Sequence, residues 1–128
     1  SCLPEATPVL PARSRLRERS DFTSVVRGPG GTRAGSRLLV VHATATDTRA
    51  GMPPRVGFVV SKAVGGAVTR NRVKRRLRAL IASHLASLPQ GVDLVVRANP
   101  AASSASFEDL EYGLIPLLHK AIRQIKVA

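Results

Sequence analysis

Apolar residues recur along this chain with two different periods, and the shorter period predicts strands. In the first such stretch, Val40 and His42 fall on one side and the intervening apolar residues on the other. A second stretch, VGFVV from Val56 onward, is apolar apart from one glycine, so it is predicted to be buried on both faces. Residues 28–35 contain four glycines and are predicted to form a loop. The three predicted strands cover residues 39–46, 55–62 and 92–98.

The longer period, about 3.6 residues, predicts amphipathic helices in the second half of the chain. One occupies residues 70–88, after a pair of glycines. The other begins after Ser106, which is expected to form a capping box with Asp109, and Pro116 is predicted to kink it. A shorter helix is predicted over residues 20–28, where a serine can serve as the N-cap.

The predicted order of elements is helix, strand, strand, helix, strand, helix, which is typical of one sheet packed against helices. A chain of 128 residues is long enough for one domain with its own core. Residues 1–12 contain three prolines and are predicted to be a flexible N-terminal lead-in, and residues 13–128 are predicted to form a single domain. The predicted fold class is therefore α+β, a small two-layer α/β sandwich.

The helix predicted over residues 70–88 carries a dense cluster of positive charge. Six of the nine residues from Arg70 to Arg78 are basic. At about 100° per residue, an apolar stripe falls on one side of the helix and most of the charges fall elsewhere. The stripe consists of Val73, Leu77, Leu80, Ile81, His84 and Leu88. Guanidinium groups suit a phosphate partner, because their planar fork matches two oxygens and stays charged near neutral pH.

Two interpretations of this charge are open. A charged run is often a solvated helix face on which glutamates form i,i+4 pairs with the cations. This chain has no acidic residue between Asp47 and Asp93, whereas nine basic residues lie in that interval. Unpaired like charges on adjacent turns repel each other, so the pattern favours a polyanionic partner that relieves the repulsion.

The composition narrows the kind of polyanion. A net charge of +12 points to a nucleic acid or an anionic membrane surface, and a hydrophobic content of 44% argues for a folded chain. No apolar stretch is long enough to span a bilayer, and the basic helix lacks the bulky apolar anchors of a membrane-surface helix. Nucleic acid is therefore preferred. The single cysteine, Cys2, excludes an internal disulfide and fits a reducing compartment.

The sequence offers no catalytic or metal-binding constellation. His42, His84 and His119 are scattered, and a lone cysteine excludes a cysteine-based metal site. His84 falls on the apolar stripe and is predicted to be a packed core histidine. A binding function has more support, because Phe22 beside the strand that carries Val40 and His42 could form a platform for stacked bases. Phe22 could equally be a core residue.

Residues 55–80, RVGFVVSKAVGGAVTRNRVKRRLRAL, resemble the protein component of bacterial ribonuclease P. Three features carry the resemblance: a Val-Gly strand that ends in Ser-Lys, a Gly-x-Ala-Val turn, and a helix that begins with Arg-Asn-Arg and continues with further cations. The matching positions are Val56, Gly57, Ser61, Lys62, Gly65, Ala67, Val68, Arg70, Asn71, Arg72, Lys74, Arg75 and Arg78.

The resemblance implies an accessory subunit of a ribonucleoprotein endoribonuclease, which removes the 5′ leader of precursor tRNA by hydrolysis. In such an enzyme the RNA performs the chemistry and chiefly holds the Mg²⁺ ions, so no catalytic residue, metal site or cofactor is expected on the protein alone. The resemblance also implies a ribosomal-protein-S5-domain-2-like fold with a left-handed β-α-β crossover. A cytoplasmic protein, monomeric outside the holoenzyme and without a membrane partner, is expected.

Two RNA-binding surfaces follow from the same resemblance. The residues expected to bind ribonuclease P RNA are Arg70, Asn71, Arg72, Lys74, Arg75, Arg76 and Arg78. The residues expected to line a cleft for the leader of precursor tRNA are Phe22, Val26, Val40, His42 and Lys62. The family often has a second aromatic where Val26 stands and a tyrosine where His42 stands, so base stacking is expected to be weaker here.

Two other functions remain open. A structural ribosomal RNA-binding protein would share the basic helix but not the spacing of the motif. A free-standing nuclease would need a catalytic constellation that the sequence does not supply.

Overall fold

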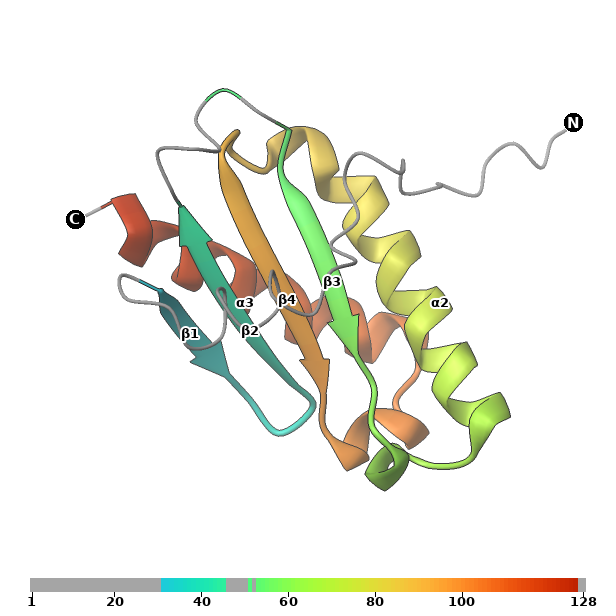
Figure 1. Cartoon of the computed structure of the whole chain (residues 1–128). Helices are drawn as coiled ribbons and strands as arrows, with labels where there is room; N and C mark the ends of the chain where they lie inside the picture. The colour runs from blue at the N-terminus through green and yellow to red at the C-terminus, as the bar shows by residue number, and fades with distance from the viewer. Residues whose placement is uncertain (1–30, 46–50, 52, 127–128) are drawn as a thin grey trace, which may run out of the picture.

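The computed structural model describes residues 31–45, 51 and 53–126, which form a four-stranded sheet with two long helices (Figure 1). The strands are β1 (Thr32–Gly35), β2 (Leu39–Ala45), β3 (Arg55–Val59) and β4 (Val92–Ala98). The helices are α2 (Ala67–His84) and α3 (Phe107–Lys126). The short 3₁₀ helices are η4 (Lys62–Val64), η5 (Leu85–Ser87) and η6 (Pro100–Ser104).

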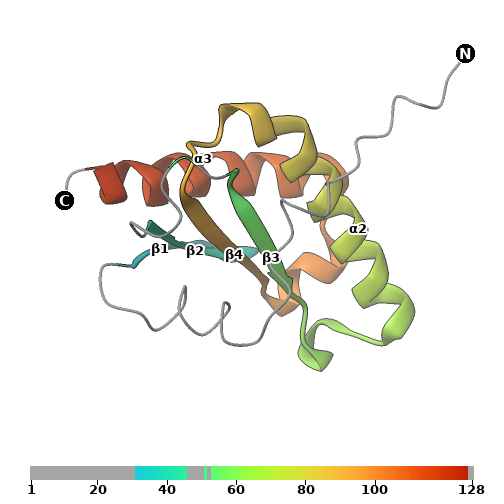
Figure 2. The ribbon, with the colours of Figure 1, turned by 45° about the horizontal axis from the view of Figure 1, so that its top comes forward.

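The sheet has the strand order β1-β2-β4-β3. The pairs β1–β2 and β2–β4 are antiparallel, whereas β3 and β4 are parallel and are connected through α2. In Figure 1 both parallel strands run down the page, and β4 lies to the left of β3. Figures 1 and 2 together show that α3 lies behind the sheet and that α2 runs along the β3 edge on the same side as α3. The crossover is therefore left-handed, as expected from the resemblance, although about 98% of such connections are right-handed.

One face of the sheet and the two helices enclose a single hydrophobic core. Val41 and Leu94 on the strands are completely buried, as are Leu77 on α2 and Leu114 on α3. Helix α3 reaches the far edge of the sheet, where the hydroxyl of Thr32 donates to the carbonyl of Ala121 at 2.9 Å. On the other face of the sheet, Val40 and Val95 are also buried but do not belong to this core.

Several sequence predictions are confirmed. The strand at 92–98 and the strand beginning at residue 39 are present, the latter ending at Ala45. The capping box exists in both directions: the amide of Asp109 donates to Ser106 Oγ at 3.0 Å, and the amide of Ser106 donates to Asp109 Oδ2 at 3.3 Å. Helix α3 continues through Pro116 as one element. The predicted helix at 20–28 lies outside the described residues.

Other predictions are wrong, and each error has a physical cause. Residues 32–35 form edge strand β1 rather than a loop, because pairing with β2 outweighs the local glycine content. Strand β3 is not buried on both faces: it lies at the other edge of the sheet, and Val59 is only half-buried. Helix α2 starts at Ala67, three residues before Arg70, because Gly66 already serves as its N-cap.

Candidate nucleic-acid interface

Helix α2 is fixed to the protein by its apolar stripe. Gly65 takes a φ of 154° where η4 ends, a conformation that favours glycine, and the chain then turns into α2. The predicted stripe is confirmed for its aliphatic members, which are all buried: Val73, Leu77, Leu80, Ile81 and Leu88. With this side against the core, the opposite side of α2 faces outward.

The outward side of α2 carries a cluster that we call the outward basic face, formed by Asn71, Lys74, Arg75 and Arg78. These side chains line a shallow hollow of about 520 Å³ together with Val68, which is 79% exposed. They share one face because positions three and four apart in a helix are neighbours. None of the four side chains makes a hydrogen bond or ion pair with another described residue.

Two other arginines of the motif are bonded to the protein's own backbone. The guanidinium of Arg72 donates to the carbonyl of Ser103 at 3.2 Å, and that of Arg76 donates to the carbonyl of Ala105 at 3.0 Å. Both carbonyls lie in or just after η6, so the two arginines attach α2 to the segment that leads into α3. Arg70 is half-buried, and its Nε is enclosed without a hydrogen-bond partner among the described residues. The seven predicted contact residues therefore divide into the four of the outward basic face and three others, of which Arg72 is exposed but bonded to the backbone and Arg70 and Arg76 are half-buried.

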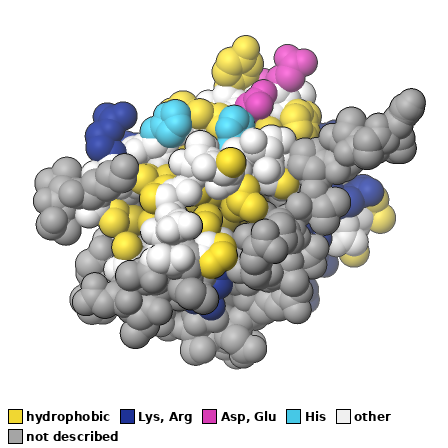
Figure 3. Space-filling model, turned by 90° about the horizontal axis from the view of Figure 1, so that it is seen from above, with side chains coloured by type: hydrophobic (Ala, Val, Ile, Leu, Met, Phe, Trp, Pro, Cys, Tyr) yellow, Lys and Arg dark blue, Asp and Glu magenta, His cyan; other side chains and the backbone are white. Residues whose placement is uncertain are grey.

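The acidic side chains of the described residues stand apart from the outward basic face. Asp93 on β4 accepts two hydrogen bonds from Arg55, at 3.0 Å from Nε and 2.7 Å from a terminal nitrogen. The other three, Glu108, Asp109 and Glu111, lie in the first turns of α3, where the helix dipole stabilises negative charge. Figure 3 shows acidic side chains next to histidines at the margin on the helix side. The positive charge of α2 is thus not neutralised within the described part of the chain.

His84 is not the packed core histidine that the sequence predicted. Its side chain is 36% exposed, and its Nε2 lies 3.9 Å from Glu111 Oε2. His84 is the last residue of α2, and the chain continues as η5 before buried Leu88, so the α-helical spacing that placed His84 on the stripe does not continue past it. A helical wheel does not register where the helix stops.

Of the residues predicted to line the leader cleft, the structure describes Val40, His42 and Lys62. Val40 and His42 lie on the same face of β2, opposite the helices, as expected from their spacing. Lys62 is exposed and follows β3 at the end of the sheet where Val40 lies. Phe22 and Val26 lie outside the described residues.

Two arginines that the sequence analysis did not select flank His42. Arg33 pairs with His42 in the register of β1 and β2, and Arg97 projects from β4 on the same face. Burial lowers the pKa of His42 below its ordinary value of 6.5, and the positive charges of Arg33 and Arg97 lower it further. His42 is therefore a neutral ring between two cations near neutral pH. The alternation of residues in VDLVVRA could have predicted that Arg97 lies on this face of the sheet. The position of Arg33 could not be predicted, because residues 28–35 were predicted to form a loop.

The described residues contain no group of three His, Cys, Asp or Glu side chains that could hold a metal ion. Within the same part of the chain, no helix has the length and apolar character needed to cross a membrane.

The fold and the site define a small basic α+β protein with a left-handed crossover and a cationic helix face that has no bonded partner among the described residues. The family model for ribonuclease P matches residues 10–122. The chain belongs to the ribonuclease P protein family.

Individual relatives are similar over nearly their whole lengths. The ribonuclease P protein component of Streptomyces bikiniensis is 50% identical over 120 residues, covering 89% of this chain and 96% of that protein. That of Beutenbergia cavernae is 55% identical over 103 residues, covering 80% and 83% respectively. The solved RNase P protein of Staphylococcus aureus has a TM-score of 0.73 at 26% identity, covering 85% of this chain and 97% of that one. That of Thermotoga maritima has a TM-score of 0.71 at 28% identity, covering 84% and 97%.

Proposed function

We propose that this protein is the RNA-binding subunit of a ribonuclease P holoenzyme and assists removal of the 5′ leader from precursor tRNA. The observation that carries the proposal is the outward basic face of α2, whose side chains make no bond with other described residues. In this proposal Asn71, Lys74, Arg75 and Arg78 contact phosphates of the catalytic RNA. Each cation that meets a phosphate releases bound counterions, which makes a salt-sensitive contribution to affinity.

The leader of precursor tRNA is assigned to the sheet face opposite the helices. A single strand can place a base against the neutral ring of His42, because base stacking does not require a particular sequence. Arg33 and Arg97 stand on either side of that ring and are suited to the neighbouring phosphates. Lys62 offers a further cation at the end of this face. Val40, which is buried, lies beneath this face and supports it.

The chemistry itself is assigned to the RNA subunit and its Mg²⁺ ions. The protein contributes positive charge that reduces repulsion between two RNA molecules, which otherwise has to be screened by metal ions. We accordingly place its activity in the bacterial cytoplasm, with the RNA subunit and precursor tRNA as partners.

Cleavage of precursor tRNA at low Mg²⁺ tests this function. The RNA subunit is assayed alone, with the protein, and with a variant in which Lys74, Arg75 and Arg78 are replaced by glutamine. The wild-type protein is expected to restore cleavage that the RNA lacks at low Mg²⁺, and the variant to restore much less. An Arg123→Gln protein, which loses an exposed cation of α3, is the control and should behave as wild type. If the wild-type protein does not increase cleavage, the proposed function is wrong.

A further inference from the structure

A second basic surface lies at the edge of the sheet farthest from α2. Arg33 on β1 and Lys120 on α3 border a hollow of about 640 Å³, which we call the β1-edge hollow. Its other described lining residues are Ala34, Gly35, Ser36, Val40 and Asn99. Neither cation has a hydrogen bond or ion pair with another described residue, and no acidic side chain is among these lining residues. The charge on the rim is therefore available to an anionic ligand.

The hollow is held open by the backbone around it. The side-chain amide of Asn99 donates to the carbonyls of Ser36 and Arg37 at 3.0 and 3.2 Å, and the amide N–H of Asn99 donates to the carbonyl of Leu38 at 2.9 Å. These three bonds fix the turn between β1 and β2 to the end of β4. A ligand would meet a preformed surface, which reduces the entropy lost on binding.

Gly35 keeps part of the hollow empty because it has no side chain. A Cβ at Gly35 would lie 3.4 Å from Cγ2 of Val40, which is an ordinary van der Waals contact. A larger residue is therefore tolerated at this position, but its side chain would occupy space beside Val40. This makes Gly35 a site at which the hollow can be filled without changing its charge.

The β1-edge hollow continues the sheet face to which the leader is assigned. Val40 lines the hollow and also lies on the same face of β2 as His42. Arg33 is paired with His42 in the sheet register. Strand β3 lies three strand spacings from β1, which is roughly 14 Å at the usual distance between strands. The outward basic face lies beyond β3. The hollow is thus connected to the sheet face and separate from α2.

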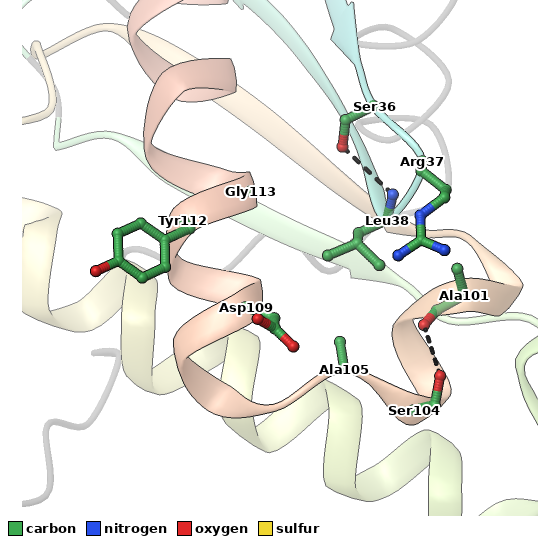
Figure 4. Close-up of a pocket in the computed structure, with 9 residues that line it drawn as sticks. All are labelled: Ser36, Arg37, Leu38, Ala101, Ser104, Ala105, Asp109, Tyr112 and Gly113. Atoms are coloured by element: carbon green, nitrogen blue, oxygen red, sulfur yellow. Dashed lines mark hydrogen bonds between the residues drawn. The ribbon is translucent and has the colours of Figure 1, made fainter.

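The neighbouring hollow in Figure 4 is less suited to an anion. It is lined by Arg37 and Leu38 together with residues of η6 and α3, including Asp109. The carboxylate of Asp109 would repel a phosphate, and the ring of Tyr112 projects on the opposite side of α3 from Leu38. The two hollows share only Ser36, so the charge of Asp109 does not lie within the β1-edge hollow.

We propose that the β1-edge hollow binds phosphates of single-stranded RNA, namely the part of the 5′ leader that extends beyond the sheet face. This inference rests on the proposed function. A flexible single strand can bend over the edge of the sheet and follow Arg33 and Lys120, whereas a hollow of this size does not admit a duplex.

The test uses the assembled holoenzyme and precursor tRNAs whose leaders are lengthened one nucleotide at a time. Affinity is measured for wild type, Arg33→Gln, Lys120→Gln and the control Arg123→Gln. Lys120 and Arg123 lie on the same helix and are both exposed, and either substitution removes one positive charge. Only Lys120 lines the hollow, whereas Arg123 lies outside it. Loss of one phosphate contact of a single strand is expected to cost roughly fourfold in affinity at about 0.15 M salt, from a slope of about 0.7 per phosphate.

For Lys120→Gln the loss should be absent with short leaders, appear once the leader passes the sheet face, and remain constant after that. Arg33→Gln should lose affinity as soon as the leader reaches His42, because Arg33 also stands beside that ring. Gly35→Thr should reproduce the dependence of Lys120→Gln on leader length without changing the charge, and threonine suits a strand. The inference is overturned if Lys120→Gln and Arg123→Gln have equal effects, or if the loss does not depend on leader length. In either case wild-type protein still restores cleavage at low Mg²⁺, so this failure is distinguishable from failure of the proposed function.

Discussion

Replacing Arg76 or Arg75 by glutamine should separate the structural and RNA-binding parts of the motif, although the two residues are adjacent. Arg76 is half-buried and donates to the carbonyl of Ala105 at 3.0 Å, whereas Arg75 is exposed and has no bonded partner among the described residues. The helical period places Arg75 opposite the apolar stripe and Arg76 on its flank, but it does not show that Arg76 has a backbone partner. Arg76→Gln is therefore expected to affect stability, and Arg75→Gln to affect RNA affinity.

The magnitudes follow from these contacts. A hydrogen bond from a charged donor contributes about 1.5–3 kcal/mol to stability, and the carbonyl of buried Ala105 would lose its partner. Relief of repulsion between like charges on α2 returns only about 0.2–0.5 kcal/mol. The net loss for Arg76→Gln is therefore about 2 kcal/mol, or a decrease in Tm of roughly 8 °C for a domain of this size. Arg75→Gln should change stability by less than about 0.5 kcal/mol.

RNA binding should show the reverse order. Loss of one phosphate contact lowers the salt slope by about 0.9 and the affinity roughly fivefold at about 0.15 M salt. This loss is expected for Arg75→Gln, measured by filter binding to the RNA subunit at a temperature where both variants are folded. Arg76→Lys is the control, because it keeps the charge but not the planar donor. If Arg76→Gln melts like wild type and binds RNA as poorly as Arg75→Gln, the division of the motif is incorrect.

Three further predictions concern other described residues. Asp93→Asn should lower the free energy of unfolding by about 2–4 kcal/mol in urea titrations, because Arg55 would lose a bidentate partner in a largely buried position; an unchanged midpoint would contradict this role. In an NMR titration, the pKa of His42 should lie below 6.5 in the free protein and rise when single-stranded RNA binds. A pKa at or above 6.5 in the free protein would disagree with the structure. Because the unfolded chain binds this proton more readily, the contribution of His42 to stability is complete above pH 6.5 and is lost as the pH falls below it. Gly65→Ala should lower Tm by several degrees, since its φ of 154° is unfavourable for alanine and the new Cβ would lie 3.0 Å from Cγ2 of Thr69; an equal or higher Tm would show that this turn is not strained.

The elements that could be predicted from the sequence are those in which a local pattern coincides with burial. The aliphatic stripe of α2 and the Ser106–Asp109 capping box belong to this group, because both depend on residues within two or three turns of each other. The same holds for the shared face of Val40 and His42, which follows from the period of a strand.

The features that could not be predicted depend on contacts between distant segments. Strand β1 exists because it pairs with β2, and the inward bonds of Arg72 and Arg76 exist because η6 passes beside α2. The position of Arg33 next to His42 requires both the strand and its register. Helix α2 ends at His84 and η5 follows it, although the apolar period of the sequence continues to Leu88.

The salt dependence of binding to the RNA subunit tests the central claim most directly, namely that the outward basic face of α2 meets phosphates. The slope of log affinity against log salt is compared between wild type and a variant in which Lys74, Arg75 and Arg78 are glutamine. Loss of three phosphate contacts should reduce the slope by about 2.7 while the Tm changes little. An unchanged slope in a folded variant would contradict the account.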